Sequence, residues 1–257
     1  MPKFAANLTL LFTEYPLTDR FDAARRAGFG GVELLIPYDT PAPELARALR
    51  DSGLSMVLIN TPAQDWAAGD RGLAALPGRE AAFRDSFELS LDYAAHLSPD
   101  HIHIMAGLAS GAEAHATYLR NLSWATTRAP QQSLTIEPIN SIDMPGFFLN
   151  DFDQAADILD QFKAPNLSLQ FDAYHAHRIT GDMPATWARH RHRTRHIQIA
   201  GTEGRHEPTG GAIDYPTFFA LLDAQGYTGH VSAEYLPAAK TEDGLGWLWP
   251  YSAPAMP

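Results

Sequence analysis

The stretch SLTIEPIN, residues 133–140, has the pattern of a half-buried β-strand that ends in a carboxylate. Leu134 and Ile136 alternate with polar residues, which is the period of two that such a strand shows. Glu137 continues the polar set, and Pro138 follows it directly. A carboxylate is costly to bury unless it is paired or binds a metal ion. What Glu137 faces therefore depends on whether other strands end in the same way.

Short apolar segments with the composition of strands alternate with helical patterns along the whole chain. We expect strands at residues 4–8, 31–36, 55–60, 101–106, 133–139, 167–172, 195–200 and 230–235. Amphipathic helices are expected at 19–29, 42–53, 78–97, 151–162, 184–194 and 215–226. This alternation indicates parallel βα units, and eight of them predict an α/β protein with one (β/α)8 TIM-barrel domain over residues 1–257. An open doubly wound sheet is the alternative, but no glycine-rich phosphate turn follows the first strand.

Composition and charge indicate the cellular compartment of the protein and disfavour some classes of partner. The formal net charge is −11, which disfavours a nucleic-acid partner because such binding needs clustered Lys and Arg. The chain has no cysteine, which excludes disulfides and thiolate metal sites. The N-terminal residues lack the features of a signal peptide, and no apolar run reaches membrane-spanning length. We therefore expect a cytoplasmic protein with no membrane partner.

Four of the predicted strands place a polar side chain close to their carboxyl end. These residues are Glu137, Asp172, Gln198 and Glu234. Each alone would be an ordinary polar residue, but they follow one another by about one βα unit, so they belong to adjacent strands of one rim. Three carboxylates in a small pocket need a counter-charge, since repulsion otherwise forces protons onto them. A divalent cation supplies it: oxygen ligands favour Mg²⁺ or Mn²⁺, and a nearby histidine would suit Co²⁺ or Zn²⁺.

Other residues are candidates for substrate contacts around this predicted metal site. His175 follows Asp172 by three positions and could reach the site; the alternative is an exposed loop histidine. Glu33, near the end of the second strand, could support the ligands or contact the substrate. An anionic substrate would need a cation, for which Arg71 and Arg205 are candidates on loops, with ordinary surface arginines as the alternative. Trp66 could cover the site or anchor the long loop at 62–79.

Several motifs across the chain resemble those of hydroxypyruvate isomerases and of the related 2-oxo-tetronate isomerases. Both groups are xylose-isomerase-like barrels, which also include ketose 3-epimerases and an apurinic endonuclease branch. The motifs are NLTLLFTEYPLTDRF (7–21), DWAAGDRG (65–72), PGRE (77–80), IEPIN (136–140), FDAYHAHR (171–178), HIQIA (196–200) and EY (234–235). The chain departs from the family at Leu236, where lysine is frequent, and at Ala212, where glutamate is frequent.

The resemblance implies a barrel with a divalent metal ion held by the same four strand-end residues. It also implies that Glu137 and Glu234 act as proton donor and acceptor. The expected reaction converts hydroxypyruvate into tartronate semialdehyde (2-hydroxy-3-oxopropanoate) through an enediolate, with a hydride shift as the competing route. Alternatives are a 2-oxo-tetronate isomerase, a ketose 3-epimerase, a metal-dependent endonuclease-like hydrolase and a non-catalytic sugar-acid binder. The partner is thus a small hydroxy-oxo acid, and assembly into a homo-oligomer is left open.

Overall fold

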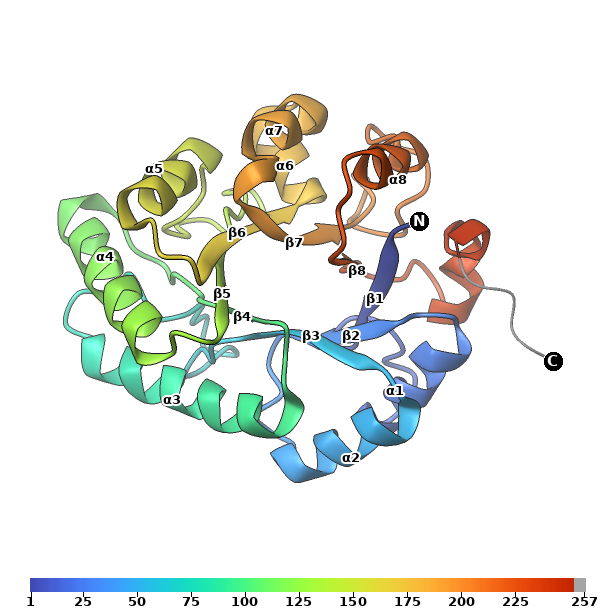
Figure 1. Ribbon diagram of the computed structural model, residues 1–257, viewed down its shortest axis with the longest axis horizontal. Coiled ribbons are helices and arrows are strands. Elements are labelled where there is room, and N and C mark those ends of the chain that lie inside the picture. Colours follow the sequence, from blue (N-terminus) through green and yellow to red (C-terminus); the bar gives the residue numbers. More distant parts are fainter. Residues whose placement is uncertain (252–257) are drawn as a thin grey trace.

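Eight parallel strands form a closed barrel in the computed structural model, which describes residues 1–251 (Figure 1). The strands are β1 (Lys3–Asn7), β2 (Gly31–Leu34), β3 (Ser55–Asn60), β4 (His101–His103), β5 (Ser133–Ile136), β6 (Leu167–Asp172), β7 (Thr194–Ile199) and β8 (His230–Ala233). Each pairs with the next in the chain, and β1 pairs with β8 to close the sheet. The predicted (β/α)8 barrel is therefore confirmed. The prediction of one domain over 1–257 includes residues 252–257, which lie outside the described part.

Helices surround the barrel on the outside (Figure 1). They are α1 (Leu17–Arg26), α2 (Ala42–Ser52), α3 (Glu80–Leu97), α4 (Gly111–Arg128), α5 (Phe152–Phe162), α6 (Ala173–Thr180), α7 (Met183–His190) and α8 (Tyr215–Ala224), with 3₁₀ helices η1 (Arg191–Arg193), η2 (Thr241–Trp247) and η3 (Trp249–Tyr251). Helices α4 and α6 were not among the helices expected from the sequence. Strands β4 and β5 also end earlier than predicted. None of the helices within residues 1–251 is long and apolar enough to cross a membrane.

The strands separate apolar and polar side chains between the two faces of the barrel wall. Leu134 and Ile136 of β5 belong to the buried hydrophobic core. Thr135, on the opposite face, donates a hydrogen bond from Oγ1 to Gln170 of β6 at 3.0 Å. The barrel interior therefore contains buried polar groups, and these groups need hydrogen-bond partners to offset their lost hydration.

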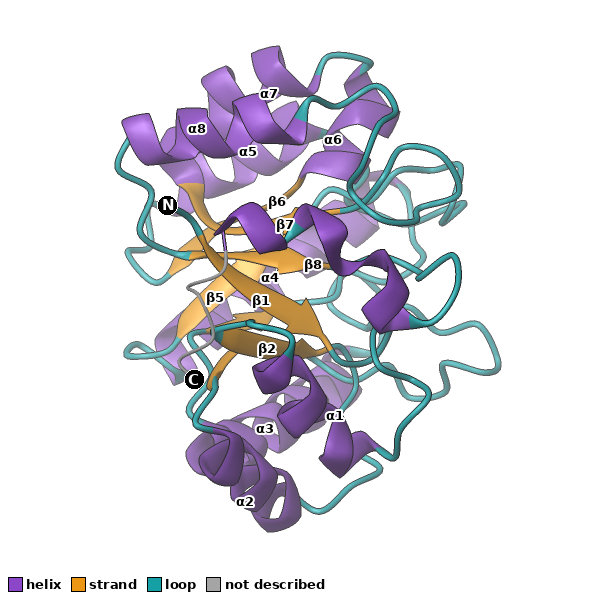
Figure 2. Cartoon of the chain, turned by 90° about the vertical axis from the view of Figure 1, so that its right-hand side faces the viewer, coloured by secondary structure: helices purple, strands orange, loops and turns teal. Residues whose placement is uncertain are grey.

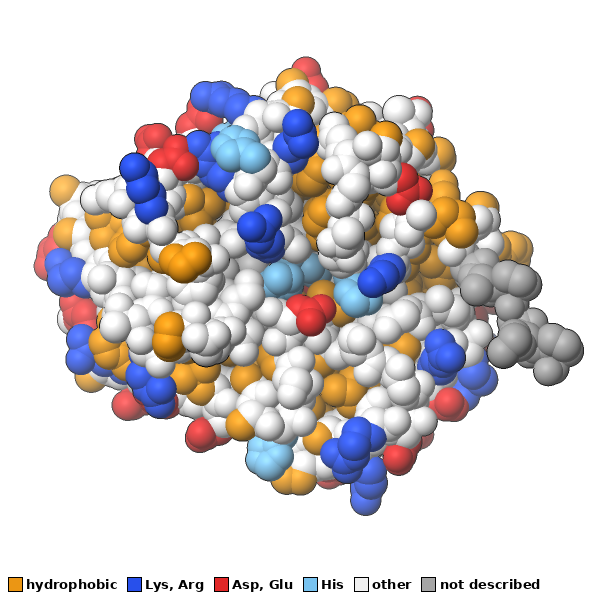
Figure 3. Space-filling view, in the orientation of Figure 1, with side chains coloured by type: hydrophobic (Ala, Val, Ile, Leu, Met, Phe, Trp, Pro, Cys, Tyr) orange, Lys and Arg blue, Asp and Glu red, His pale blue; other side chains and the backbone are white. Residues whose placement is uncertain are grey.

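The two ends of the barrel differ in the length of their loops. Figure 2 shows the longer loops at the end where the strands finish. The loop at 62–79 lies there, because Gly72 forms an antiparallel bridge with Ala106, just beyond β4. Figure 3 shows the opposite face, where histidine and charged side chains surround the centre. His230 begins β8 on that side, and its Nδ1 lies 3.7 Å from Asp100 Oδ2.

Candidate active site

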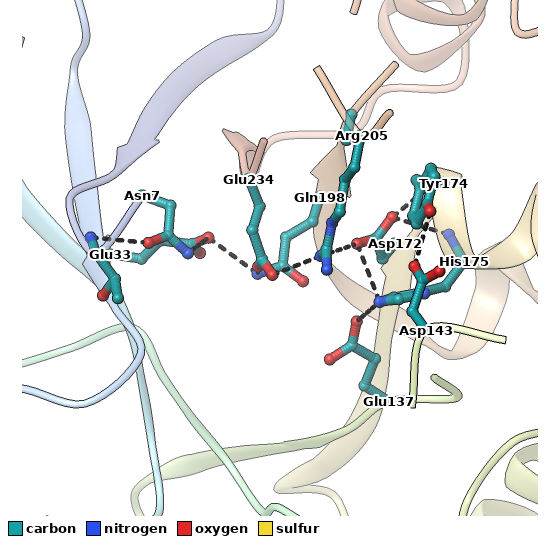
Figure 4. A network of polar contacts seen from close by, with 12 residues as sticks. Asn7, Glu33, Glu137, Asp143, Asp172, Tyr174, His175, Gln198, Arg205 and Glu234 are labelled. Carbon is teal, nitrogen blue, oxygen red and sulfur yellow. Dashed lines mark hydrogen bonds and ion pairs between the residues drawn. The ribbon is translucent and has the colours of Figure 1, made fainter. Parts of the chain in front are cut away.

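The four predicted ligands lie together at the carboxyl ends of β5, β6, β7 and β8 (Figure 4). Glu137 and Glu234 each follow the last residue of their strand, Asp172 ends β6, and Gln198 is the penultimate residue of β7. All four side chains are buried, with Asp172 and Gln198 at 0% exposure. Three acidic side chains therefore lie buried at the same end of the barrel.

One oxygen of each carboxylate is held by donors of the surrounding protein. Glu137 Oε2 accepts a hydrogen bond from Gln170 Nε2 at 3.0 Å. Asp172 Oδ1 accepts from the backbone N–H groups of Tyr174 and His175, at 2.7 and 3.1 Å. Glu234 Oε2 accepts from Gln198 Nε2. These contacts fix the orientation of each carboxylate.

The second oxygen of each carboxylate faces a common space that His175 and Arg205 also face. His175 Nε2 lies 4.0 Å from Glu137 Oε1 and 3.8 Å from Asp172 Oδ2. Arg205 Nη2 lies 3.4 Å from Asp172 Oδ2 and 2.8 Å from Glu234 Oε1. Figure 4 shows the guanidinium of Arg205 pointing between these carboxylates. These second oxygens, called the inner oxygens here, line a space in which positive charge is favourable. Those of Glu137 and Asp172 lie near His175, and those of Asp172 and Glu234 lie near Arg205.

Burial of the three carboxyl groups carries an electrostatic penalty that raises their pKa values. Burial, followed by the charges of Glu234 and Asp172, raises the pKa of Glu137 well above its ordinary value. Burial raises the pKa of Glu234 to about 8, although Arg205 acts in the opposite direction. The pKa of Asp172 is raised by burial as well. A cation in the space that the inner oxygens face would lower this electrostatic penalty.

The donor set fits a divalent cation. Ligand atoms of Glu137, Asp172 and His175 all lie within 4.8 Å of one another. Arg205 Nη2 connects this group to Glu234, since it lies 3.4 Å from Asp172 Oδ2 and 2.8 Å from Glu234 Oε1. Carboxylate oxygens are ligands that Mg²⁺ and Mn²⁺ prefer, whereas the amide oxygen of Gln198 accepts a hydrogen bond from Gln170 Nε2 at 2.7 Å.

Comparison with known proteins identifies the family. Residues 21–251 match the family described as the xylose isomerase-like TIM barrel. The chain belongs to this family. The predicted barrel type is thereby confirmed at the level of the family as well as of the fold.

Two curated relatives of this xylose isomerase-like barrel are named as isomerases, and a solved structure similar to it carries a different description. A 2-oxo-tetronate isomerase of Cupriavidus necator is 48% identical over 257 residues, covering 98% of this chain and 99% of the relative. A hydroxypyruvate isomerase of Escherichia coli is 40% identical, covering 98% and 100%. A solved structure from Brucella melitensis, described as an AP endonuclease of family 2, has a TM-score of 0.95 at 41% identity, covering 98% of this chain and 100% of that one. The resemblance found in the motifs is confirmed.

His175 of this xylose isomerase-like barrel lies in α6 and is only 2% exposed, so its interpretation as an exposed loop residue is wrong. Asn140 Nδ2 lies 2.7 Å from His175 Nδ1, while Asn140 Oδ1 accepts from the backbone of Ile142 and Asp143. Nδ1 of His175 therefore accepts a hydrogen bond. Burial and then Arg205 hold the pKa of His175 well below its ordinary value, so the neutral ring carries its proton on Nε2, facing the carboxylates.

Of the remaining predicted site residues, two contact the proposed metal ligands and two do not. Arg205 reaches the carboxylates and is a half-buried residue rather than a solvated surface arginine. Glu33 is fully buried inside the barrel, where it accepts a hydrogen bond from Gln198 Nε2 at 2.9 Å. Arg71 instead lies over the ring of Trp66 at 4.0 Å, and within residues 1–251 no polar contact joins either of them to the carboxylates.

Asn140 and Gln170 are among the residues that contact the site but were not predicted as part of it. Asn140 lies within the IEPIN motif and fixes the orientation of His175. Gln170 lies on the same face of β6 as Asp172, two positions earlier, and contacts Glu137 and Gln198. The period of two could have indicated Gln170, because it places that side chain inside the barrel with Asp172.

Proposed function

We propose that the protein is an aldose–ketose isomerase that interconverts hydroxypyruvate and tartronate semialdehyde. The observation that carries this proposal is the pair of buried glutamates, Glu137 and Glu234, whose inner oxygens face one space at the end of the barrel. A carboxyl group whose pKa lies near the working pH can both accept and donate a proton. Burial raises the pKa of Glu234 to about 8 and also raises that of Glu137. The names of the relatives support a small hydroxy-oxo acid as the substrate.

The proposed cofactor is a divalent cation, Mg²⁺ or Mn²⁺, with Co²⁺ or Zn²⁺ as alternatives. The residues that would hold it are Glu137, Asp172, Gln198 and Glu234. When bound, such a cation polarises the substrate carbonyl and stabilises the negative charge of the enediolate. The ligand atoms of Glu137, Asp172 and His175, which all lie within 4.8 Å of one another, support a cation beside these residues.

The proposed proton transfers use the two glutamates on different carbons. One glutamate removes the proton from C3 of hydroxypyruvate, and the other returns a proton to C2. The hydroxyl proton on C3 passes to the oxygen on C2, so the carbonyl moves from C2 to C3 and all atoms balance. Arg205 would bind the substrate carboxylate through a charge-assisted hydrogen bond, and His175 would donate from Nε2 to a substrate oxygen.

A second candidate substrate is 2-oxo-tetronate. The observation in its favour is the 48% identity to a relative named for that reaction. The same pair of glutamates would act on this longer acid, and a ketose 3-epimerase would use them on a longer substrate still. The candidates therefore differ in the pocket around the substrate tail and share the acid–base chemistry.

Turnover with defined metal ions tests the proposal. Purified protein is stripped of metal, supplied with Mg²⁺, Mn²⁺ or Co²⁺, and given hydroxypyruvate, 2-oxo-tetronate or a ketose in parallel. We expect metal-dependent turnover of one of the two acids and a loss of roughly 10²–10⁴-fold in Glu137→Gln, the range typical of general acid–base groups. If metal binds and neither acid is converted, the isomerase proposal is overturned.

The same assay in D₂O distinguishes proton transfer from a hydride shift. Because different glutamates take and return the proton, the hydrogen that reaches C2 should come from solvent, and mass spectrometry should find one deuterium on that carbon. Product without deuterium would favour the hydride shift.

The proposals from other functional classes have less support. An endonuclease-like hydrolase needs a basic surface to hold phosphates, whereas this chain has a net charge of −11. Incubation with DNA containing abasic sites tests that class directly, and binding of an acid without turnover would indicate a sugar-acid binder. A cytoplasmic location, the absence of membrane and nucleic-acid partners, and assembly into a homo-oligomer stay predictions.

A further inference from the structure

Gln170 connects two of the proposed metal ligands from inside the barrel. Its side chain is buried, with 1% exposure. Nε2 donates to Glu137 Oε2 at 3.0 Å and to Gln198 Oε1 at 2.7 Å. An amide nitrogen carries two hydrogens, so both are used on proposed ligands. The side-chain oxygen accepts from Thr135 Oγ1 at 3.0 Å. Every donor and acceptor group of this amide therefore has a partner within the barrel.

The orientation of these amides follows from the acceptors around them. Gln198 Nε2 donates to both Glu33 Oε1 and Glu234 Oε2. Both partners accept through a carboxylate oxygen, so the nitrogen of Gln198 lies on that side. The oxygen of Gln198 then faces Gln170, which must present its own nitrogen. Reversing either amide would place oxygen against oxygen in a buried region, at a high electrostatic cost.

We propose that Gln170 is a positioning residue for the metal centre. It holds the outer oxygen of Glu137, which directs the inner oxygen toward the proposed cation, and it holds the amide oxygen of Gln198, which keeps the amide nitrogen of Gln198 on Glu234. Gln170 does not face the inner oxygens itself, so it acts through the two residues it touches. This inference rests on the proposed metal-dependent function and assigns a new residue to it.

Loss of Gln170 would leave its partners without an equivalent replacement. The other polar atom near Glu137 Oε2 is Nδ1 of His103, which is 3.6 Å away and is also 3.2 Å from Asn60 Oδ1. That distance is too long for a good hydrogen bond. Glu137 could then turn its outer oxygen away, and the ligand geometry would loosen. Residues that orient metal ligands in this way typically contribute 10–100-fold to metal affinity or activity.

The test measures Mn²⁺ affinity of metal-stripped protein by calorimetric titration. Gln170→Met removes both donors at similar length, and Gln170→Leu is a second variant with a different shape. Asn121→Leu is the matched control, since Asn121 is also a buried amide but donates to the backbone of Ala74. Thermal melting of each metal-free variant reports its folding separately from its metal binding.

We expect roughly 10–100-fold weaker Mn²⁺ binding in both Gln170 variants and unchanged binding in Asn121→Leu. We also expect kcat at saturating Mn²⁺ to fall in the Gln170 variants while KM changes little. Wild-type affinity in a folded Gln170 variant would overturn the inference and leave the proposed function intact. An absence of Mn²⁺ binding by the wild-type protein would overturn the metal centre and, with it, the role of Gln170.

Discussion

Arg205 supplies the positive charge that allows three acidic side chains to share one pocket. Burial opposes its charge, but Glu234, Asp172 and Glu137 together hold the pKa of the guanidinium above its ordinary value. The guanidinium carbon Cζ of Arg205 lies over the ring of Tyr174, 5.3 Å from the ring centroid, which is a cation–π contact. Its backbone has a φ of 55°, which is uncommon for a residue with a side chain. A left-handed conformation at this loop position is therefore part of how the charge reaches the site.

His101, at the other end of the barrel, makes stability depend on pH. Burial and then His196 lower its pKa to about 3, and Nδ1 lies 2.9 Å from Ser133 Oγ. The unfolded chain binds this proton near the ordinary pKa of 6.5, so the contribution of the neutral ring is present above pH 6.5 and is lost as the pH falls toward 3. The expected loss is about 1.4 kcal/mol per pH unit in this window.

Denaturant unfolding at several pH values checks this prediction. His101→Gln should lose less unfolding free energy between pH 6.5 and 4.5 than the wild type does. His96→Gln, which changes an exposed histidine of α3, is the matched control and should follow the wild type. Equal pH slopes for all three proteins would contradict the assignment.

At the scale of elements, one side chain has two roles at the junction between β6 and α6. Asp172 ends the strand and is also the N-cap of the helix. Its Oδ1 holds the first N–H groups of α6, and this leaves Oδ2 on the ligand side. Because α6 begins without a loop, His175 lies at the first turn and faces the same space.

This double role predicts that two substitutions of Asp172 differ in their effects. Asp172→Asn keeps a good capping oxygen, so the unfolding free energy of the metal-free protein should stay close to that of the wild type. Asp172→Ala removes the cap and should cost about 0.5–2 kcal/mol. Both should weaken Mn²⁺ binding strongly, which calorimetry measures. A large loss of stability in Asp172→Asn would show that the capping argument is incorrect.

The loop at 62–79 is held against β4 by a position that requires glycine. Gly72 has a φ of 107°, and a Cβ there would lie 2.4 Å from the backbone oxygen of Met105. Gly72→Ala should therefore detach this part of the loop and cost about 1–3 kcal/mol, the range for strained backbone. Limited proteolysis should cut the loop faster. Gly78→Ala is the matched control, because Gly78 also has a positive φ but no atom within 4 Å, and proteolysis there should change less.

At the scale of the whole molecule, closure of the barrel brings the last strand to the first. Phe4 of β1 packs against Phe219 and Trp247, at ring distances of 5.0 and 5.3 Å. The β1–β8 pairing runs from Lys3–His230 to Ala6–Ala233, immediately before Glu234. The proposed metal site therefore joins groups that closure of the barrel brings together.

Metal binding should accordingly stabilise the whole fold. At a free Mn²⁺ concentration of 100 times Kd, the unfolding free energy should rise by about 2.7 kcal/mol. For a chain of this length, that corresponds to a rise in melting temperature of roughly 5–10 °C. Differential scanning calorimetry measures the shift, and Asp172→Asn should show little of it. An unchanged melting temperature at saturating Mn²⁺ would contradict a site built from four strands.

The sequence by itself determined the architecture and the polar residues of the rim. Alternation of apolar and polar residues is a local pattern, so it indicated the strands and the face to which Glu137, Asp172, Gln198 and Glu234 belong. Helix α4 was missed although Ala114, Tyr118 and Leu122 repeat at a helical spacing. Helix α6 was harder to find, because it starts inside the motif that ends β6 and has only eight residues.

The tertiary structure alone decided how the polar side chains pair with one another. Glu33 and Gln198 are far apart in the chain, and their hydrogen bond exists because the closed sheet brings β2 and β7 together across the interior. The same closure directs Gln170 to Glu137 and the loop residue Arg205 to Glu234. Local periodicity gives the face of a strand on which a side chain lies. The partner of that side chain depends on strand register and barrel closure, which are properties of the whole fold.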